Sequence, residues 1–131
     1  EKFQKLCAKN LARVGLQENV RQFNQDIEQG TQLREMDCVF VDVRTPWEYL
    51  DQIAPTARNG APIGFLLPTM NQVSQLLEGL EAGPFSDVEV VELMLRHYKP
   101  VPDRLRPEDR MIAHTGFLVF ARLNKTGQEK E

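Results

Sequence analysis

Cysteine is scarce in this sequence, and long apolar runs are absent from it. Cys7 and Cys38 have no metal-ligand spacing and stand among apolar neighbours, which predicts buried thiols in a reducing compartment. No run approaches the roughly 20 apolar residues that a transmembrane helix needs, and the N-terminus has no signal-peptide pattern. We therefore expect no metal site, no membrane association and a cytoplasmic location.

The sequence also lacks an excess of positive charge. Its 131 residues carry a net charge of -3, so a nucleic-acid site would have to be a local basic patch. Five of the sixteen Lys and Arg residues do cluster, between residues 96 and 110, together with His97. This cluster is a candidate strip for phosphate contacts, and it consists of Arg96, Lys99, Arg104, Arg106 and Arg110.

Hydrophobic periodicity predicts helices that alternate with buried strands over the first two thirds of the chain. Helices are expected over residues 1–14 with Gly15 as the cap, from Pro46 to Gly60, and from Thr69 to the Ala-Gly-Pro at 82–84. Strands are expected at 19–23, at 38–41 and at 62–68, and a polar turn is expected at 26–30. The apolar run at 38–41 suits a parallel strand covered on both faces.

From residue 88 the pattern changes to two strand-like runs, 88–101 and 111–123, joined by a segment rich in proline and arginine. These runs should pair as an antiparallel hairpin at the edge of the sheet, and residues 124–131 form a polar tail. The fold class is thus an open α/β sheet, and such sheets bind ligands beyond the carboxyl ends of their strands. Asp26 and Asp42 stand at two such ends.

Two families offer resemblances at residues 41–49, VDVRTPWEY. This stretch resembles the segment before the active site of the rhodaneses, but their sulfur transfer needs a later cysteine nucleophile, and no cysteine follows Cys38. The second resemblance covers residues 1 to about 123, to the tRNA adenine-N1 methyltransferases of the TrmI/Trm61 family. It rests on VDVRTPWEYL at 41–50, TMNQVSQLLEGL at 69–80 and LRPEDRMIAHTGFLVFAR at 105–122.

That resemblance implies a class I, Rossmann-like methyltransferase that moves a methyl group from S-adenosylmethionine to N1 of the T-loop adenine at tRNA position 58. It also implies a homotetramer, or a hetero-oligomer with a related subunit. Open alternatives are a non-catalytic tRNA-binding or assembly subunit and a class I methyltransferase with another acceptor, since fold does not fix function.

The resemblance assigns two carboxylates to the reaction site. Asp26 would accept from the adenine amino group of the cofactor, and its alternative is a turn aspartate that caps its own backbone. Asp42 would serve as the catalytic residue beside the target adenine and also contact the cofactor, because a carboxylate stabilises the positive charge that N1 methylation creates. The alternative for Asp42 is an N-cap or loop aspartate.

Further positions are candidates for substrate binding. Pro46 and Trp47 would shape the mouth of the adenine pocket, although a core tryptophan is equally plausible. Thr69 and Gln72, at a helix start, would contact a base or ribose, or simply cap the helix. Arg104, Arg106 and Arg110 would contact tRNA phosphates, or form a solvated loop or subunit contact. His114 lies in an apolar run, where a structural histidine is the alternative.

The sequence departs from the family pattern in its glycines. An S-adenosylmethionine enzyme of this fold needs a glycine-rich turn after its first strand, and no two of the eight glycines have G-x-G spacing. We therefore expect residues 1–123 to be a partial catalytic domain that begins after the first two strands. A fragment of a full enzyme, a partly reported sequence and a non-catalytic subunit would all show this feature.

Overall fold

The computed structural model describes residues 2–110 and 115–125, which belong to two compact units. The first unit runs to Thr31 and the second begins at Gln32. Within the described residues, no helix is both long and apolar enough to cross a membrane.

The first unit is a helix followed by two short 3-10 turns. Helix α1 spans Lys2–Arg13 and is followed by η1 at Gln17–Asn19 and η2 at Ile27–Gln29. Gly15, at φ 71°, ends α1 in the left-handed conformation that glycine adopts without strain. The predicted helix, its cap and the turn at 26–30 are confirmed. The prediction of a strand at 19–23 is wrong: no described segment pairs with those residues, and an extended segment becomes a strand only when a ladder partner is present.

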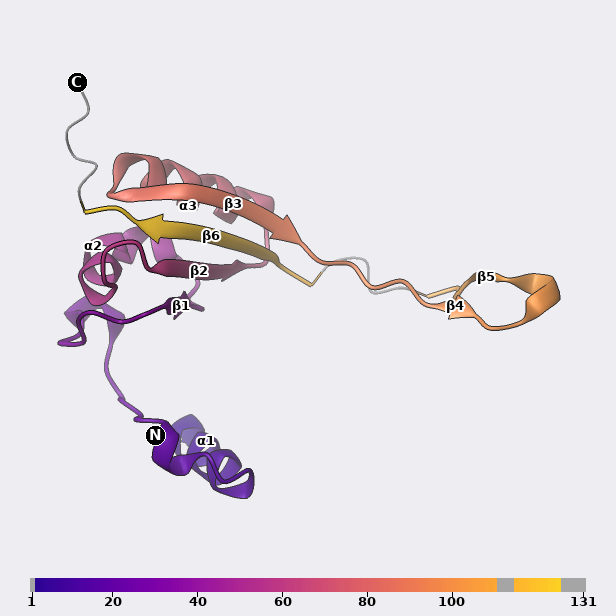
Figure 1. Ribbon diagram of the computed structural model, residues 1–131, viewed down its shortest axis with the longest axis horizontal. Helices are drawn as coiled ribbons and strands as arrows, with labels where there is room; N and C mark the ends of the chain where they lie inside the picture. Colours follow the sequence, from indigo (N-terminus) through magenta and orange to yellow (C-terminus); the bar gives the residue numbers. More distant parts are fainter. Residues whose placement is uncertain (1, 111–114, 126–131) are drawn as a thin grey trace. The chain divides into compact units, whose positions relative to one another are not determined.

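The second unit is built on a four-stranded mixed sheet of order β1-β2-β6-β3 (Figure 1). β1 (Val39–Val41) runs parallel to β2 (Pro62–Leu67), whereas β6 (Phe117–Leu123) is antiparallel to both β2 and β3 (Phe85–Glu92). The predicted hairpin is therefore confirmed as the β3–β6 pair. Of these two strands, only β3 lies at an edge of the sheet, because β6 pairs on its other side with β2.

Helices cover one face of this sheet and form the core with it. The helical segment after β1 consists of η3 (Pro46–Tyr49), α2 (Leu50–Ile53) and η4 (Ala54–Thr56), and α3 (Met70–Ala82) packs against the strands. The fully buried side chains of the core include Ile63, Phe65, Leu67, Leu76, Leu80 and Val119. Alternating strand residues point to this face, as the pleat requires.

The opposite face of the sheet is apolar and exposed within the described residues. Phe40 is 61% exposed, and Leu66 on the neighbouring strand is 36% exposed. The parallel direction of the strand at 38–41 is confirmed, but its burial on both faces is not. Cys7 and Cys38 are also exposed rather than buried, because α1 contains no buried residue in its own unit and Cys38 precedes a strand with only one neighbour.

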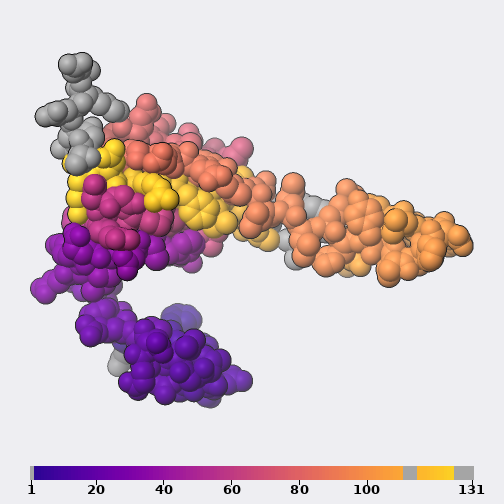
Figure 2. Space-filling model, viewed as in Figure 1, coloured from indigo at the N-terminus to yellow at the C-terminus, as the bar shows by residue number. Residues whose placement is uncertain are grey.

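Between β3 and β6 the chain extends away from the sheet as a long hairpin (Figures 1 and 2). We call its described residues 93–110 the arm. Its strands β4 (Tyr98–Lys99) and β5 (Arg106–Pro107) form a separate two-stranded ladder, with η5 (Pro102–Arg104) at the tip. The arm exposes six large apolar side chains, namely Leu93, Met94, Leu95, Tyr98, Val101 and Leu105.

Candidate functional site

The carboxyl ends of β1 and β2 lie at one edge of the sheet, because the two strands are parallel. Asp42 directly follows β1, and Thr69 follows β2 after a single proline. Asp42 is exposed, and among residues 2–110 and 115–125 its carboxylate has no hydrogen-bond or ion-pair partner. A carboxylate that the fold leaves unpaired can accept hydrogen bonds from a ligand.

The loop that carries Asp42, residues 42–46, is fixed by its surroundings. Pro46 is among the fully buried residues and opens η3. Thr45 Oγ1 donates to Glu48 Oε2 at 2.8 Å, and Gln72 Nε2 donates to the Arg44 carbonyl oxygen at 3.0 Å. Both the backbone and the far end of the loop are therefore held while the Asp42 carboxylate stays open to solvent.

Thr69 and Gln72 form a reciprocal cap at the start of α3. The Gln72 backbone N–H donates to Thr69 Oγ1 at 3.4 Å, and Thr69 Oγ1 donates to Gln72 Oε1 at 2.7 Å. The capping alternative is thus present in the structure, and the side-chain amide of Gln72 reaches the Asp42 loop in addition. Sequence reasoning missed this link. The Thr-x-x-Gln and Thr-x-x-Glu spacings at 69–72 and 45–48 were the available signal, since they are typical of capping boxes.

Trp47 is half-buried and lies against α3. A side chain at Gly79 would meet the Trp47 Cβ at 3.5 Å, and both residues line a hollow that also includes Phe85, near the C-terminal end of α3. The structure thus shows a packing contact for this tryptophan.

Asp26 lies in the first unit and caps η2. Its Oδ1 accepts from the Glu28 backbone N–H at 3.1 Å, which is the turn-capping alternative. The second carboxylate oxygen has no partner among the described residues.

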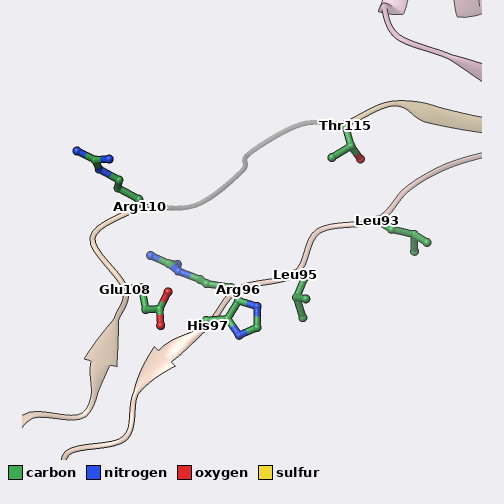
Figure 3. A pocket seen from close by; sticks show the side chains of 7 residues that line it. All are labelled: Leu93, Leu95, Arg96, His97, Glu108, Arg110 and Thr115. Carbon is green, nitrogen blue, oxygen red and sulfur yellow. The ribbon is translucent and has the colours of Figure 1, made fainter.

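The three predicted phosphate contacts, Arg104, Arg106 and Arg110, are exposed on the arm. Lys99 and Asp109 form an ion pair across the same ladder. Near the base of the arm lies a hollow whose lining residues come from both sides of the hairpin (Figure 3). Arg96 and Arg110 extend toward the same side of this view, and the other lining residues are Leu93, Leu95, His97, Glu108 and Thr115. His114 falls outside the described residues. Within those residues, no group of His, Cys, Asp and Glu could hold a metal ion.

Residues 1–109 match the family model described as the tRNA methyltransferase complex GCD14 subunit. The chain belongs to this family. A solved structure of the tRNA (m1A58) methyltransferase TrmI from Aquifex aeolicus is 48% identical, with a TM-score of 0.85 over 95% of this chain and 51% of that one. A SAM-dependent O-methyltransferase from Thermotoga maritima is 41% identical, with a TM-score of 0.89 over 94% of this chain and 46% of that one.

A tRNA (adenine(57)-N(1)/adenine(58)-N(1))-methyltransferase TrmI from Methanocaldococcus jannaschii is 27% identical over 86% of this chain and 40% of its own length. The chain therefore spans about half the length of the two solved structures and less of this relative. The predicted family and the class I methyltransferase fold, here a part of the Rossmann-like sheet that ends in an antiparallel hairpin, are confirmed.

Proposed function

We propose that the protein to which this chain belongs is an S-adenosylmethionine-dependent tRNA (adenine-N1)-methyltransferase, acting on the T-loop adenine at position 58. The observation that carries the proposal is Asp42: an exposed carboxylate, without a partner among the described residues, on a fixed loop at the carboxyl ends of two parallel strands. Family membership and the names of the relatives from Aquifex aeolicus and Methanocaldococcus jannaschii support the same reaction.

The carboxylate of Asp42 has a chemical reason to stand beside the acceptor. The nucleophile is the N1 lone pair, and its methylation leaves a positive charge on the adenine. A carboxylate held by the loop can accept from the adenine amino group and stabilise that charge as it develops. Because N1 needs no deprotonation, the remaining task of the protein is to hold an in-line approach and to receive an adenine that has left its stack.

Asp26 fits the adenine end of the cofactor, which supplies the methyl group as a sulfonium. One of its oxygens caps η2 and the other is open to an exocyclic amine. Asp42 stays a proposed cofactor contact as well. No other cofactor contact is assigned to this chain.

The arm is the proposed contact with tRNA, through Arg104, Arg106 and Arg110. Their exposed guanidinium groups suit phosphate oxygens, which account for much of the affinity of proteins for nucleic acids. Pro46, Trp47, Thr69, Gln72 and His114 stay proposed substrate contacts, and the cytoplasm stays the proposed location.

The apolar side chains of the arm support a second proposal, that the arm also joins subunits. Leu95 is 72% exposed and Leu105 is 71% exposed, and clustered apolar exposure is typical of protein interfaces. The assembly would be a homotetramer, or a hetero-oligomer with a related subunit. The family description, which names a complex, supports an assembly of either kind.

Two other functions can be separated from this proposal by experiment. The relative from Thermotoga maritima carries an O-methyltransferase name, so another acceptor is the first alternative. The second is a non-catalytic tRNA-binding or assembly subunit. Methyl transfer to tRNA should therefore be measured on the protein as its cell makes it, with N1-methyladenosine identified by mass spectrometry of the digested tRNA.

The decisive variant is Asp42→Ala. Removing a group that stabilises the transition state typically costs roughly 10²–10³-fold in kcat, and we expect tRNA affinity to change little. The matched control is Asp51→Ala, which removes an exposed carboxylate from α2 and should leave the rate unchanged. Full activity in Asp42→Ala would contradict the role of this residue. Absence of N1-methyladenosine with the unmodified protein would contradict the proposed reaction itself.

A further inference from the structure

The start of α3 touches the Asp42 loop through one side chain, that of Gln72. Its Nε2 donates to the Arg44 carbonyl oxygen at 3.0 Å, across 28 residues of sequence. Gln72 is half-buried, and its backbone N–H is engaged by the Thr69 hydroxyl. A side-chain amide that bridges two segments in this way fixes their relative position.

The orientation of the amide is set by the Arg44 carbonyl, which can only accept and therefore requires the amide nitrogen to face it. The Thr69 hydroxyl donates to Gln72 Oε1 at 2.7 Å, so the oxygen of the amide is occupied as well. A flip would place two acceptors, Oε1 and the Arg44 carbonyl oxygen, against each other and would break the contact between α3 and the loop. Thr69, Gln72 and the Arg44 carbonyl thus form a directed chain of hydrogen bonds.

The hydrogen bonds end at Arg44, two residues along the sequence from Asp42. The Asp42 carboxylate itself has no partner within the described residues. On the β1 side, Val41 is buried and pairs with Phe65, and on the other side Pro46 is fully buried. The Arg44 carbonyl lies between these anchors, so the bond from Gln72 restrains the middle of the loop from the side of α3. Misplacement of a reacting group by about 1 Å can cost 10²-fold in rate.

We infer that Gln72, held in place by Thr69, is a positioning residue that acts on the methyl-transfer site through the backbone of the Asp42 loop. This inference rests on the proposed function. It gives Thr69 and Gln72 a part in catalysis that requires no contact with tRNA.

The test uses Gln72→Glu in the protein as its cell makes it. A carboxylate cannot donate to the Arg44 carbonyl, yet glutamate keeps the size of glutamine and suits the first turn of a helix capped by threonine. The matched control is Gln75→Glu, the same change at an exposed position of α3. We expect kcat to fall on the order of 10–100-fold in Gln72→Glu only, with unchanged dissociation constants for tRNA and S-adenosylmethionine.

Two further measurements separate positioning from a general loss of structure. Thr69→Ser, which keeps the hydroxyl, should retain the rate, whereas Thr69→Val should lose it. In addition, Gln72→Glu should have no further effect in an Asp42→Ala background, because two residues that act as a unit are not additive. Additive losses, or weaker tRNA binding at unchanged kcat, would overturn the inference.

Hydrogen exchange at the backbone amides of residues 42–45 tests the contact between Gln72 and the Asp42 loop independently of catalytic activity. Faster exchange is expected in Gln72→Glu and not in Gln75→Glu, and equal exchange in the two variants would overturn the inference. An unmodified protein that forms no N1-methyladenosine would instead overturn the proposed function, so the two failures are distinguishable.

Discussion

The Asp42 loop and the arm both carry charged groups proposed to act on tRNA, but they are supported in different ways. The loop lies between a buried valine and a buried proline, and α3 holds its backbone with a hydrogen bond from Gln72. The arm has a ladder of two residue pairs, an exposed ion pair and six exposed apolar side chains. The comparison indicates that the proposed methyl transfer requires a carboxylate whose position is fixed by the core. Phosphate and subunit contacts instead require a segment that extends beyond the sheet and exposes a large surface.

The largest difference should appear in stability. Phe65 is 0% exposed at the centre of the sheet, so Phe65→Ala should lower the free energy of unfolding by about 3–5 kcal/mol through the cavity that it leaves. Asp103→Ala at the exposed tip of the arm is the control and should change it by less than about 0.5 kcal/mol. Both values come from chemical denaturation at one fixed protein concentration. Equal losses of unfolding free energy would show that the arm contributes to the same core as the sheet and its helices.

A smaller effect is expected on assembly. If the apolar side chains of the arm join subunits, Leu95→Glu with Leu105→Glu should raise the dissociation constant of the oligomer roughly 10²-fold or more, since each buried leucine contributes about 1.5–3 kcal/mol. Light scattering coupled to size-exclusion chromatography gives the mass. Met70→Glu, at an exposed methionine on α3, should leave the mass unchanged. A monomeric unmodified protein would remove assembly as the role of the arm.

The smallest effect should be on tRNA affinity at low salt. Arg104→Ala with Arg106→Ala should reduce the slope of log affinity against log salt by about 2, because each phosphate contact contributes about one unit. Fluorescence anisotropy with labelled tRNA across a salt series measures this slope. Arg58→Ala with Arg122→Ala removes two exposed arginines that lie outside the arm and should leave the slope unchanged. If the Arg58 and Arg122 pair changed the slope and the arm pair did not, the phosphate contacts proposed for the arm would be contradicted.

Local patterns predicted most of the elements correctly. The helix at 1–14, the parallel strand at 38–41, the helix after Thr69 and the antiparallel pairing of the last two strands all follow from periodicity and caps, which depend on neighbours in sequence. The prediction of a strand at 19–23 failed because pairing depends on a distant partner. The burial of Cys38 and of both faces of β1 failed for the same reason, since exposure depends on which segments cover a surface.

The sequence by itself determined the family, the class of fold and the position of Asp42 after a parallel strand, because motif order and hydrophobic pattern are properties of the chain. Only the tertiary structure decided that the Asp42 carboxylate has no partner in the described part of the chain, that Gln72 holds the Arg44 carbonyl at 3.0 Å and that the arginines lie on an arm beyond the sheet. Such contacts join residues far apart in sequence. They exist only once the parallel β1–β2 pair brings two strand ends to one edge of the sheet.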